Sequence, residues 1–181
     1  MIKHFLYVAC ILLAVTSTVC AANPDDTYNP QEPQLQSSQV DTHGTDEASW
    51  RGRAREVLVN ALSLTGVRYK YGGKSPESGF DCSGFVRYVY QQAGNLTLPH
   101  SARAISQLGK TIPKSELQPG DLVFFNTLKS TFSHVGIYLG GNRFIHSPSS
   151  GGGVRVEDMQ SSYWEKRFNG AQRIEASAKG N

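Results

Sequence analysis

The sequence predicts an α+β domain in which helices pack on a central antiparallel sheet. Two features of the chain support this fold class. Helical patterns of apolar residues occupy residues 54–94, and the second half of the chain contains short apolar runs separated by turn signals such as Gly140-Gly141-Asn142. Helices followed by hairpin-linked strands are typical of α+β domains. No internal repeat is present in the sequence.

Residues 1–22 have the pattern of a secretory signal peptide. Lys3 and His4 form a short basic start, and the apolar stretch Phe5–Val15 is too short to span a bilayer. Small residues follow around Ala21 and Ala22, where cleavage is expected. The short apolar stretch disfavours a retained membrane anchor. We therefore expect export to the periplasm or cell envelope, and secretion stays open.

Acylation of Cys20 is the alternative to simple cleavage of the signal. Lipoprotein signals place a small residue just before the cysteine and a bulky apolar residue three before it. This chain has Val19 and Ser17 at those positions, which disfavours lipidation. Contact with a membrane is therefore expected only if Cys20 is acylated.

Residues 23–48 are rich in Pro, Gln, Ser, Thr and Asp and show no hydrophobic period. Such a segment cannot bury enough apolar surface to offset its chain entropy, so it is predicted to be a disordered tether. Residues 49–181 are predicted to form one domain of ordinary size, which we expect to be a monomer.

The charge of the exported chain is close to balanced. Removal of Lys3 with the signal leaves 17 basic against 15 acidic residues. A net charge of this size does not indicate a nucleic-acid surface, and we expect no nucleic-acid partner.

The first helix is expected to start near Ser49 and to stop at Gly66. Residues 69–73 (Tyr-Lys-Tyr-Gly-Gly) should be extended and enter an irregular loop, because glycines and Pro76 interrupt regular structure there. The residues that recur at helical spacing in the first helix are Ala54, Val57, Leu58, Ala61, Leu62 and Thr65.

The second helix is expected to start at Cys82, with Asp81 as its N-cap and Gly94 at its C-terminus. Ser101 is expected to cap a shorter helix that ends near Gln107. The predicted buried stripe of the second helix consists of Cys82, Phe85, Val86, Val89 and Ala93.

The remaining apolar runs are predicted to be strands. Residues 121–126 follow the turn signal Pro119-Gly120, and their continuous apolar character indicates burial on both faces. Residues 134–139 and 143–147 flank a hairpin signal. Further strands are expected at 154–157 and 168–174.

Cys82 is the candidate nucleophile. Cys10 and Cys20 lie in or beside the signal, so Cys82 has no partner for a structural disulfide. At the first turn of a helix, free backbone N–H groups and the helix dipole favour a thiolate, so we expect a lowered Cys82 pKa. The alternative is that Cys82 is a small buried hydrophobic residue.

Two histidines strengthen the catalytic hypothesis. If residues 140–142 form a three-residue loop, Leu139 pairs with Arg143 and Gly136 faces His146. His134 and His146 are then diagonal neighbours on one sheet face, about 7–8 Å apart at the backbone. A two-residue loop would place them on opposite faces.

Two imidazoles beside a thiol suit nucleophilic catalysis, with His134 as the base and His146 as the residue that orients it. A Cys-His-His set could instead bind zinc, but the chain has no C-x-x-C or H-E-x-x-H motif. We therefore expect no metal and no cofactor.

Five blocks of this chain, in this order, resemble the NlpC-type cell-wall peptidases. The resemblance covers about residues 54–174. The blocks are Gly72-Gly73, Phe80-Asp81-Cys82-Ser83-Gly84-Phe85-Val86, Pro119-Gly120-Asp121-Leu122-Val123-Phe124-Phe125, His134-Val135-Gly136-Ile137-Tyr138-Leu139-Gly140 and Phe144-Ile145-His146.

The resemblance implies a papain-like fold and a Cys-His-His triad at Cys82, His134 and His146. It implies hydrolysis of peptidoglycan stem peptides, often between γ-D-glutamate and a diamino acid. It further implies that Tyr69 lines the cleft near the oxyanion, with core packing as the alternative.

By the same resemblance, Asp81 and Ser83 help to hold substrate, and for Asp81 helix capping is a compatible role. His100 departs from the family, because many relatives carry arginine there; the sequence gives it no role. Two alternatives to the peptidase function stay open. One is an amidase or acyltransferase on the same scaffold, and the other is a catalytically silent envelope-binding module.

Overall fold

The computed structural model describes residues 42–127 and 130–175. The predicted signal peptide, the possible lipidation site Cys20 and residues 23–41 of the predicted tether lie outside this part of the chain. The elements are α1 (Thr42–Ser63), β1 (Lys74–Ser75), β2 (Gly79–Phe80), α2 (Cys82–Gly94), α3 (Ala102–Ile105), β3 (Lys110–Thr111), the 3₁₀ turn η1 (Lys114–Glu116), β4 (Leu122–Phe125), β5 (His134–Gly140), β6 (Arg143–His146), β7 (Arg155–Asp158), α4 (Ser162–Glu165) and β8 (Phe168–Arg173).

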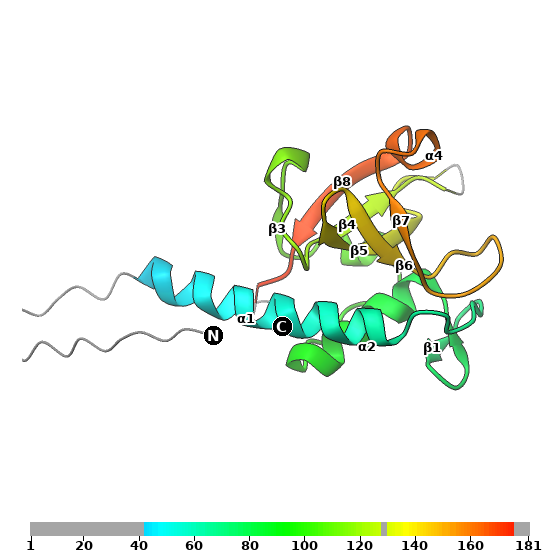
Figure 1. Cartoon of the computed structure of the whole chain (residues 1–181), viewed down its shortest axis with the longest axis horizontal. Coiled ribbons are helices and arrows are strands. Elements are labelled where there is room, and N and C mark those ends of the chain that lie inside the picture. The colour runs from blue at the N-terminus through cyan, green and yellow to red at the C-terminus, as the bar shows by residue number, and fades with distance from the viewer. Residues whose placement is uncertain (1–41, 128–129, 176–181) are drawn as a thin grey trace, which may run out of the picture. The chain divides into compact units, whose positions relative to one another are not determined.

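The described part contains a six-stranded sheet with the order β3-β8-β4-β5-β6-β7, in which every neighbouring pair is antiparallel. Figure 1 shows α1 and α2 side by side along one side of this sheet. All four residues of the central strand β4 are buried, as its continuous apolar run predicted. The predicted fold class, α+β with helices on an antiparallel sheet, is confirmed.

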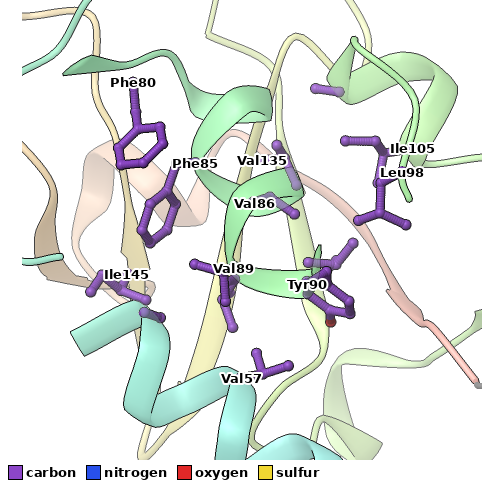
Figure 2. Close-up of a cluster of buried hydrophobic side chains, with 14 of the residues drawn as sticks. Val57, Phe80, Phe85, Val86, Val89, Tyr90, Leu98, Ile105, Val135 and Ile145 are labelled. Atoms are coloured by element: carbon purple, nitrogen blue, oxygen red, sulfur yellow. The ribbon is translucent and has the colours of Figure 1, made fainter. Parts of the chain in front are cut away.

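The two faces of the sheet carry separate hydrophobic clusters, because side chains alternate along each strand. Phe124, Val135 and Ile145 face α2, whose residues Phe85 and Val89 pack against them (Figure 2). The opposite face holds a second cluster, made of Ile112, Val123, Phe125, Tyr138, Phe144, Met159, Trp164 and Ala171.

Helix α1 begins at Thr42, so residues 42–48 belong to the helix and not to the tether. These residues carry no apolar period, and the hydrophobic pattern could not detect a helical extension without one.

Trp50 of α1 is buried at 7% exposure, whereas Leu62 is 48% exposed although it follows the helical spacing. No helix within the described part of the chain has the length and apolar character needed to cross a membrane.

Helix α2 has the predicted start, and its end differs by one residue. Asp81 is the N-cap, and its carboxylate accepts a hydrogen bond from the Gly84 N–H. The C-cap is Asn95, which adopts the left-handed conformation (φ 53°), and Gly94 is the last helical residue. Asn is the residue other than Gly that takes this conformation most readily, and the sequence analysis placed the stop on the neighbouring Gly94.

The β5–β6 hairpin has the predicted register but a different turn. Gly140 pairs with Arg143, so the loop contains only Gly141 and Asn142, both with positive φ (57° and 61°). A register shift between Tyr138 and Gly140 leaves Leu139 as an extra residue in β5. The prediction that Leu139 pairs with Arg143 is therefore wrong, and the bulge restores the parity that a two-residue loop would have lost.

A buried ion pair joins the start of β4 to the end of β8. Asp121 is fully buried, and its two carboxylate oxygens accept hydrogen bonds from Nε and Nη2 of Arg173, both at 2.8 Å. One of these oxygens also accepts the Gln118 N–H at 2.8 Å. Because β4 lies next to β5 in the sheet, this pair fixes the strand that supports the histidine-bearing hairpin.

Substitution of Asp121 by Ala should lower the free energy of unfolding by about 3 kcal/mol, because it leaves the partly buried Arg173 guanidinium and the Gln118 N–H without their acceptor. Urea denaturation followed by circular dichroism measures this loss. Glu165→Ala, which removes an exposed carboxylate from α4, is the matched control and should change stability by less than about 1 kcal/mol. An equal effect of both substitutions would contradict the role of the ion pair.

Candidate active site

Close packing of glycines fixes the start of α2. A Cβ added to Gly84 would lie 2.0 Å from the Gly73 carbonyl oxygen, so only glycine fits in this first turn. Gly73 is equally confined, since its Cβ would lie 2.3 Å from the Gly79 carbonyl oxygen. The Asp81 N–H donates to the Gly73 carbonyl at 3.1 Å. The loop and the helix start therefore form one unit that holds Cys82.

Asp81 and Ser83, which flank Cys82, form hydrogen bonds within the fold. The Asp81 carboxylate accepts from the Gly84 N–H at 2.7 Å, the Gly72 N–H at 3.0 Å and the Ser83 hydroxyl at 2.9 Å. The Ser83 side chain is buried, and its hydroxyl also lies 2.9 Å from the His100 carbonyl oxygen. The two residues thus connect the nucleophile to the loops on either side of it.

His134 and His146 lie on one face of the sheet and form a hydrogen bond. The Nε2 atom of His134 is 2.8 Å from Nδ1 of His146, and the ring planes are nearly perpendicular at 88°. Both side chains are buried, at 5% and 0% exposure. Because Nε2 of His134 is engaged in this bond, Nδ1 is the nitrogen left to act as a base.

Gly136 provides the space for this pair. The β5–β6 register, extended by one residue, places Gly136 opposite His146. A Cβ on Gly136 would lie 2.7 Å from the Phe144 ring and 3.2 Å from the His146 Cβ. Glycine at position 136 therefore leaves room for the Phe144 ring and for the backbone and Cβ of β6 that carry the His146 ring.

The strand end after His146 is tied to the nucleophile loop. The buried Ser147 hydroxyl donates to the Phe80 carbonyl at 2.8 Å, two residues before Cys82. On the other side, the backbone of Val135 hydrogen-bonds the sulfur of Cys82 and lowers the thiol pKa. Cys82 therefore lies against the residue that directly follows His134.

Aromatic and charged residues surround the imidazoles on the side away from α2. The Trp164 ring stacks on His134 with centroids 5.6 Å apart, and it meets His146 edge-on at 5.0 Å. A cavity of about 280 Å³ opens here, and His134, Trp164, Arg155 and Glu157 are among its lining residues. A larger groove of about 540 Å³ lies on α1 between Trp50 and Leu62, and neither histidine nor Cys82 lines it.

Tyr69 lies near enough to Cys82 and Asp81 to interact with both electrostatically. Its side chain is half-buried, and burial, followed by these interactions, raises the pKa of the phenol. The hydroxyl therefore stays protonated at neutral pH and keeps its ability to donate a hydrogen bond. Its place beside the oxyanion stays a prediction.

The prediction of a lowered Cys82 pKa is wrong. Burial and the nearby Asp81 carboxylate raise the thiol pKa to about 11, and they outweigh the backbone hydrogen bonds from Val135, Ser83 and Cys82 itself that lower it. The helix-start argument identified the favourable backbone groups correctly. It omitted the cost of placing a charge in a buried site beside a carboxylate.

Both imidazoles are neutral at pH 7. Burial lowers the pKa of His134 to about 3, with a further decrease from His146, whereas Glu157 acts in the opposite direction. Burial and the Arg155 charge lower the pKa of His146 to about 3. The resting site thus contains a protonated thiol and two neutral imidazoles, and neither imidazole carries a charge that could stabilise a thiolate.

His100 lies beside this site, with its ring held by a neighbour. The Nη1 atom of Arg87 is 2.8 Å from Nδ1 of His100, and Nε of Arg87 donates to the Leu98 carbonyl at 2.6 Å. Because a guanidinium only donates, Nδ1 of His100 is the acceptor and Nε2 carries the proton. Within residues 42–127 and 130–175, no group of three His, Cys, Asp or Glu side chains is placed to hold a metal ion.

A thiol beside a pair of hydrogen-bonded imidazoles is the arrangement of a cysteine hydrolase. A family profile described as the NlpC/P60 family matches residues 66–173. The chain belongs to the NlpC/P60 family.

Individual NlpC/P60 proteins match much of the chain. The "Murein DD-endopeptidase MepS/Murein LD-carboxypeptidase" of Escherichia coli K12 is 35% identical over 170 residues, which covers 91% of this chain and 89% of that protein. The "Gamma-DL-glutamyl hydrolase" of Bacillus subtilis is 40% identical over 120 residues, or 66% of this chain and 29% of that protein. The crystal structure of the NlpC/p60 domain of the peptidoglycan hydrolase SagA superposes with a TM-score of 0.59 and 34% identity, covering 67% of this chain and 98% of that one.

Membership of the NlpC/P60 family confirms the resemblance, the papain-like fold class and the assignment as a cysteine-type peptidase. Sequence reasoning nevertheless missed several residues of the site. Trp164 and Glu157 gave no signal because each is an isolated residue in an unremarkable segment. Ser147 could have been noticed as a hydroxyl directly after His146, and Arg87 as a cation one helical turn after Ser83.

Substitution of Gly136 by Ala should abolish most activity and lower stability by about 1–3 kcal/mol, because the new methyl group collides with Phe144 and displaces the His146 ring. Hydrolysis of purified muropeptides and urea denaturation measure the two effects. Gly52→Ala in α1 has open space around it and should leave activity unchanged. Wild-type activity in Gly136→Ala would refute the steric argument.

The rate of alkylation of Cys82 by iodoacetamide should rise with pH to a midpoint near 11, above that of a free thiol. Only the thiolate reacts, and a pKa raised to about 11 leaves little thiolate at neutral pH. Mass spectrometry of the Cys82 peptide gives the modified fraction. In denaturing urea the midpoint should fall to the free-thiol value. A midpoint below that value in the folded protein would show a preformed thiolate instead.

Proposed function

We propose that this chain is a murein peptidase in which Cys82, His134 and His146 form the catalytic triad. The observation that carries the proposal is the 2.8 Å bond between the two buried imidazoles, with Cys82 at the start of α2 against Val135. This arrangement supplies a nucleophile, a base and a residue that orients the base. A catalytically silent binding module would have no need to keep two buried polar rings so arranged.

In the first half of the reaction, the Cys82 sulfur attacks the scissile carbonyl carbon while Nδ1 of His134 takes the thiol proton. The Cys82 N–H and the Tyr69 hydroxyl stabilise the oxyanion. Collapse of the tetrahedral intermediate breaks the C–N bond, and His134 gives its proton to the departing amine. A thioester to Cys82 remains.

In the second half, water attacks the thioester carbonyl and gives a proton to His134. The C–S bond breaks, the acid product leaves and the proton returns to the sulfur. His146 accepts the hydrogen bond from Nε2 of His134 throughout, so it holds the ring in one tautomer.

The flanking residues contribute by position. Asp81 and Ser83 shape the substrate site through the backbone groups they hold, namely Gly72 on one side and His100 on the other. The protonated Nε2 of His100, fixed by Arg87, is an additional donor for a substrate carbonyl or carboxylate.

The substrate is peptidoglycan, and the relatives suggest two candidate bonds. The E. coli protein matches 91% of this chain and is named for a DD bond and an LD bond in murein, which favours hydrolysis between two D-configured centres. The bond between γ-D-glutamate and the diamino acid is the second candidate, because the family resemblance implies it. The name of the B. subtilis relative, a γ-DL-glutamyl hydrolase, also indicates a γ-glutamyl linkage. Action on murein also supports export of the chain to the cell envelope.

Incubation of the purified protein with isolated sacculi should release soluble muropeptides, and Cys82→Ala should release none while it keeps the wild-type circular dichroism spectrum. The product masses separate the two bonds. They also separate a peptidase from an N-acetylmuramoyl amidase or an acyltransferase. Ser115→Ala, which removes an exposed hydroxyl from the 3₁₀ turn η1, is the control and should digest like the wild type. Equal digestion by Cys82→Ala would overturn the mechanism.

A further inference from the structure

We infer that Glu157 is a positioning residue for the catalytic histidines, and that it extends the Cys82–His134–His146 chain by one member. The inference rests on the proposed function. It follows from a buried nitrogen that the triad leaves unpaired, from the carboxylate aimed at it and from the side chains that hold this carboxylate.

The unpaired atom is Nε2 of His146. It is buried and has no hydrogen-bond partner, although His146 is completely inaccessible to solvent. A buried polar atom without a partner costs about 1–3 kcal/mol, so such an atom calls for an explanation. The nearest carboxylate oxygen is Oε1 of Glu157, at 3.5 Å. This distance is an approach and not yet a hydrogen bond.

Strand pairing directs Glu157 to this place. In the β6–β7 ladder His146 pairs with Arg155, and Phe144 pairs with Glu157. Side chains two residues apart on a strand share a face, so Arg155 and Glu157 both lie on the face that carries His146. Glu157 is the diagonal neighbour of His146, within reach of its outer nitrogen.

The tautomers of both imidazoles then follow from donor and acceptor rules. For His134 to act as a base at Nδ1, its proton must be on Nε2, and it donates to Nδ1 of His146. The proton of His146 must then be on Nε2, where it points to Glu157. A carboxylate only accepts, so it selects this tautomer of His146 and, through it, the active tautomer of His134.

Glu157 is held in place by two donors. Nε of Arg155 bonds Oε1, and the indole N–H of Trp164 bonds Oε2. Trp164 is itself packed against both imidazoles. Arg155 is anchored further by a hydrogen bond from Nη1 to the Gly151 carbonyl at 2.9 Å. Catalytic hydrogen bonds are often long in substrate-free proteins and shorten in the complex, so a 3.5 Å approach by a carboxylate held in this place fits a bond that tightens during turnover.

The titratable and charged side chains that face the imidazole pair come from three elements. Cys82 approaches from α2, Arg155 and Glu157 from β7, and Tyr163 lines the same cavity from α4. Arg155 lowers the pKa of His146, whereas Glu157 raises the pKa of His134. Loss of the Glu157 charge should therefore lower the pKa of the base, and the acidic limb of the kcat/KM profile should move to lower pH.

The test compares Glu157→Gln and Glu157→Leu with the wild type in muropeptide hydrolysis over a range of pH. Glu157→Gln keeps an acceptor for Trp164 but loses the charge, so we expect lower kcat, unchanged KM and an acidic limb shifted to lower pH. Glu157→Leu should lower kcat further, on the order of 10- to 100-fold, the usual effect of removing a partner that orients a functional histidine.

The matched control is Asp158→Asn. Asp158 is the next residue of β7, is exposed and lies on the opposite face, so its kinetics and pH profile should equal those of the wild type. Imidazole ¹⁵N spectra of the free protein give a readout without substrate. The wild type should show both histidines protonated at Nε2, and Glu157→Leu should lose this preference at His146.

The outcomes separate the two proposals. If Cys82→Ala is inactive but both Glu157 variants retain the wild-type kcat and acidic limb, the inference about Glu157 is wrong and the triad stands. A wild-type His146 protonated at Nδ1 would also overturn the inference. If Cys82→Ala digests sacculi as the wild type does, the proposed function itself fails.

Discussion

The hydrogen bond between His134 and His146 depends on a single register of the β5–β6 hairpin. Side chains alternate between faces, so a shift by one residue would place the two imidazoles on opposite sides of the sheet. The chain reaches the required register with a tight two-residue turn and one extra residue, Leu139, in β5. Gly136 then leaves the space that the Phe144 ring and the His146 Cβ need. A turn, a bulge and a glycine thus together place one pair of nitrogen atoms 2.8 Å apart.

The polar groups around the nucleophile are mostly satisfied by one another. Asp81 accepts three hydrogen bonds, one of them from the buried Ser83 hydroxyl. The Ser147 hydroxyl, just after β6, donates to the Phe80 carbonyl in the loop before Cys82. These bonds fix the backbone on both sides of Cys82. In the proposed mechanism, a site that is held rigid before the substrate arrives loses little free energy in reorganisation during the reaction.

The sequence predicted the features that depend on local patterns. The α2 start at Cys82 followed from Asp81, and the doubly buried β4 followed from its apolar run. The shared face of the histidines was predicted on condition of a three-residue loop, and the structure reaches the same parity through a two-residue turn and an extra residue in β5. Three-dimensional packing decided the rest. The bulge at Leu139 and the contact of Gly84 with Gly73 have no local signal.

The Cys82 pKa is the instructive error. The backbone groups at a helix start are visible from the sequence, but burial depth and the orientation of Asp81 are not. Burial and the Asp81 carboxylate have a larger effect than the backbone hydrogen bonds, so the thiol pKa rises to about 11. For the same reason Glu157 could not be identified, since its role depends on the β6–β7 register and on Trp164.

The neutral resting state explains why oppositely charged residues lie behind the imidazoles. In the proposed mechanism the thiol proton moves to His134, so a positive charge appears in a buried site, and this is costly unless a negative charge is near. Glu157 favours a positive charge on His134, whereas Arg155 disfavours one on His146, and Arg155 and Glu157 are bonded to each other. Their pairing keeps the site close to neutral before the reaction. Under the inference drawn for Glu157, a closer approach of its carboxylate to His146 as His134 becomes charged would favour the imidazolium. The stabilisation would then develop with the transition state, which is when it accelerates a reaction.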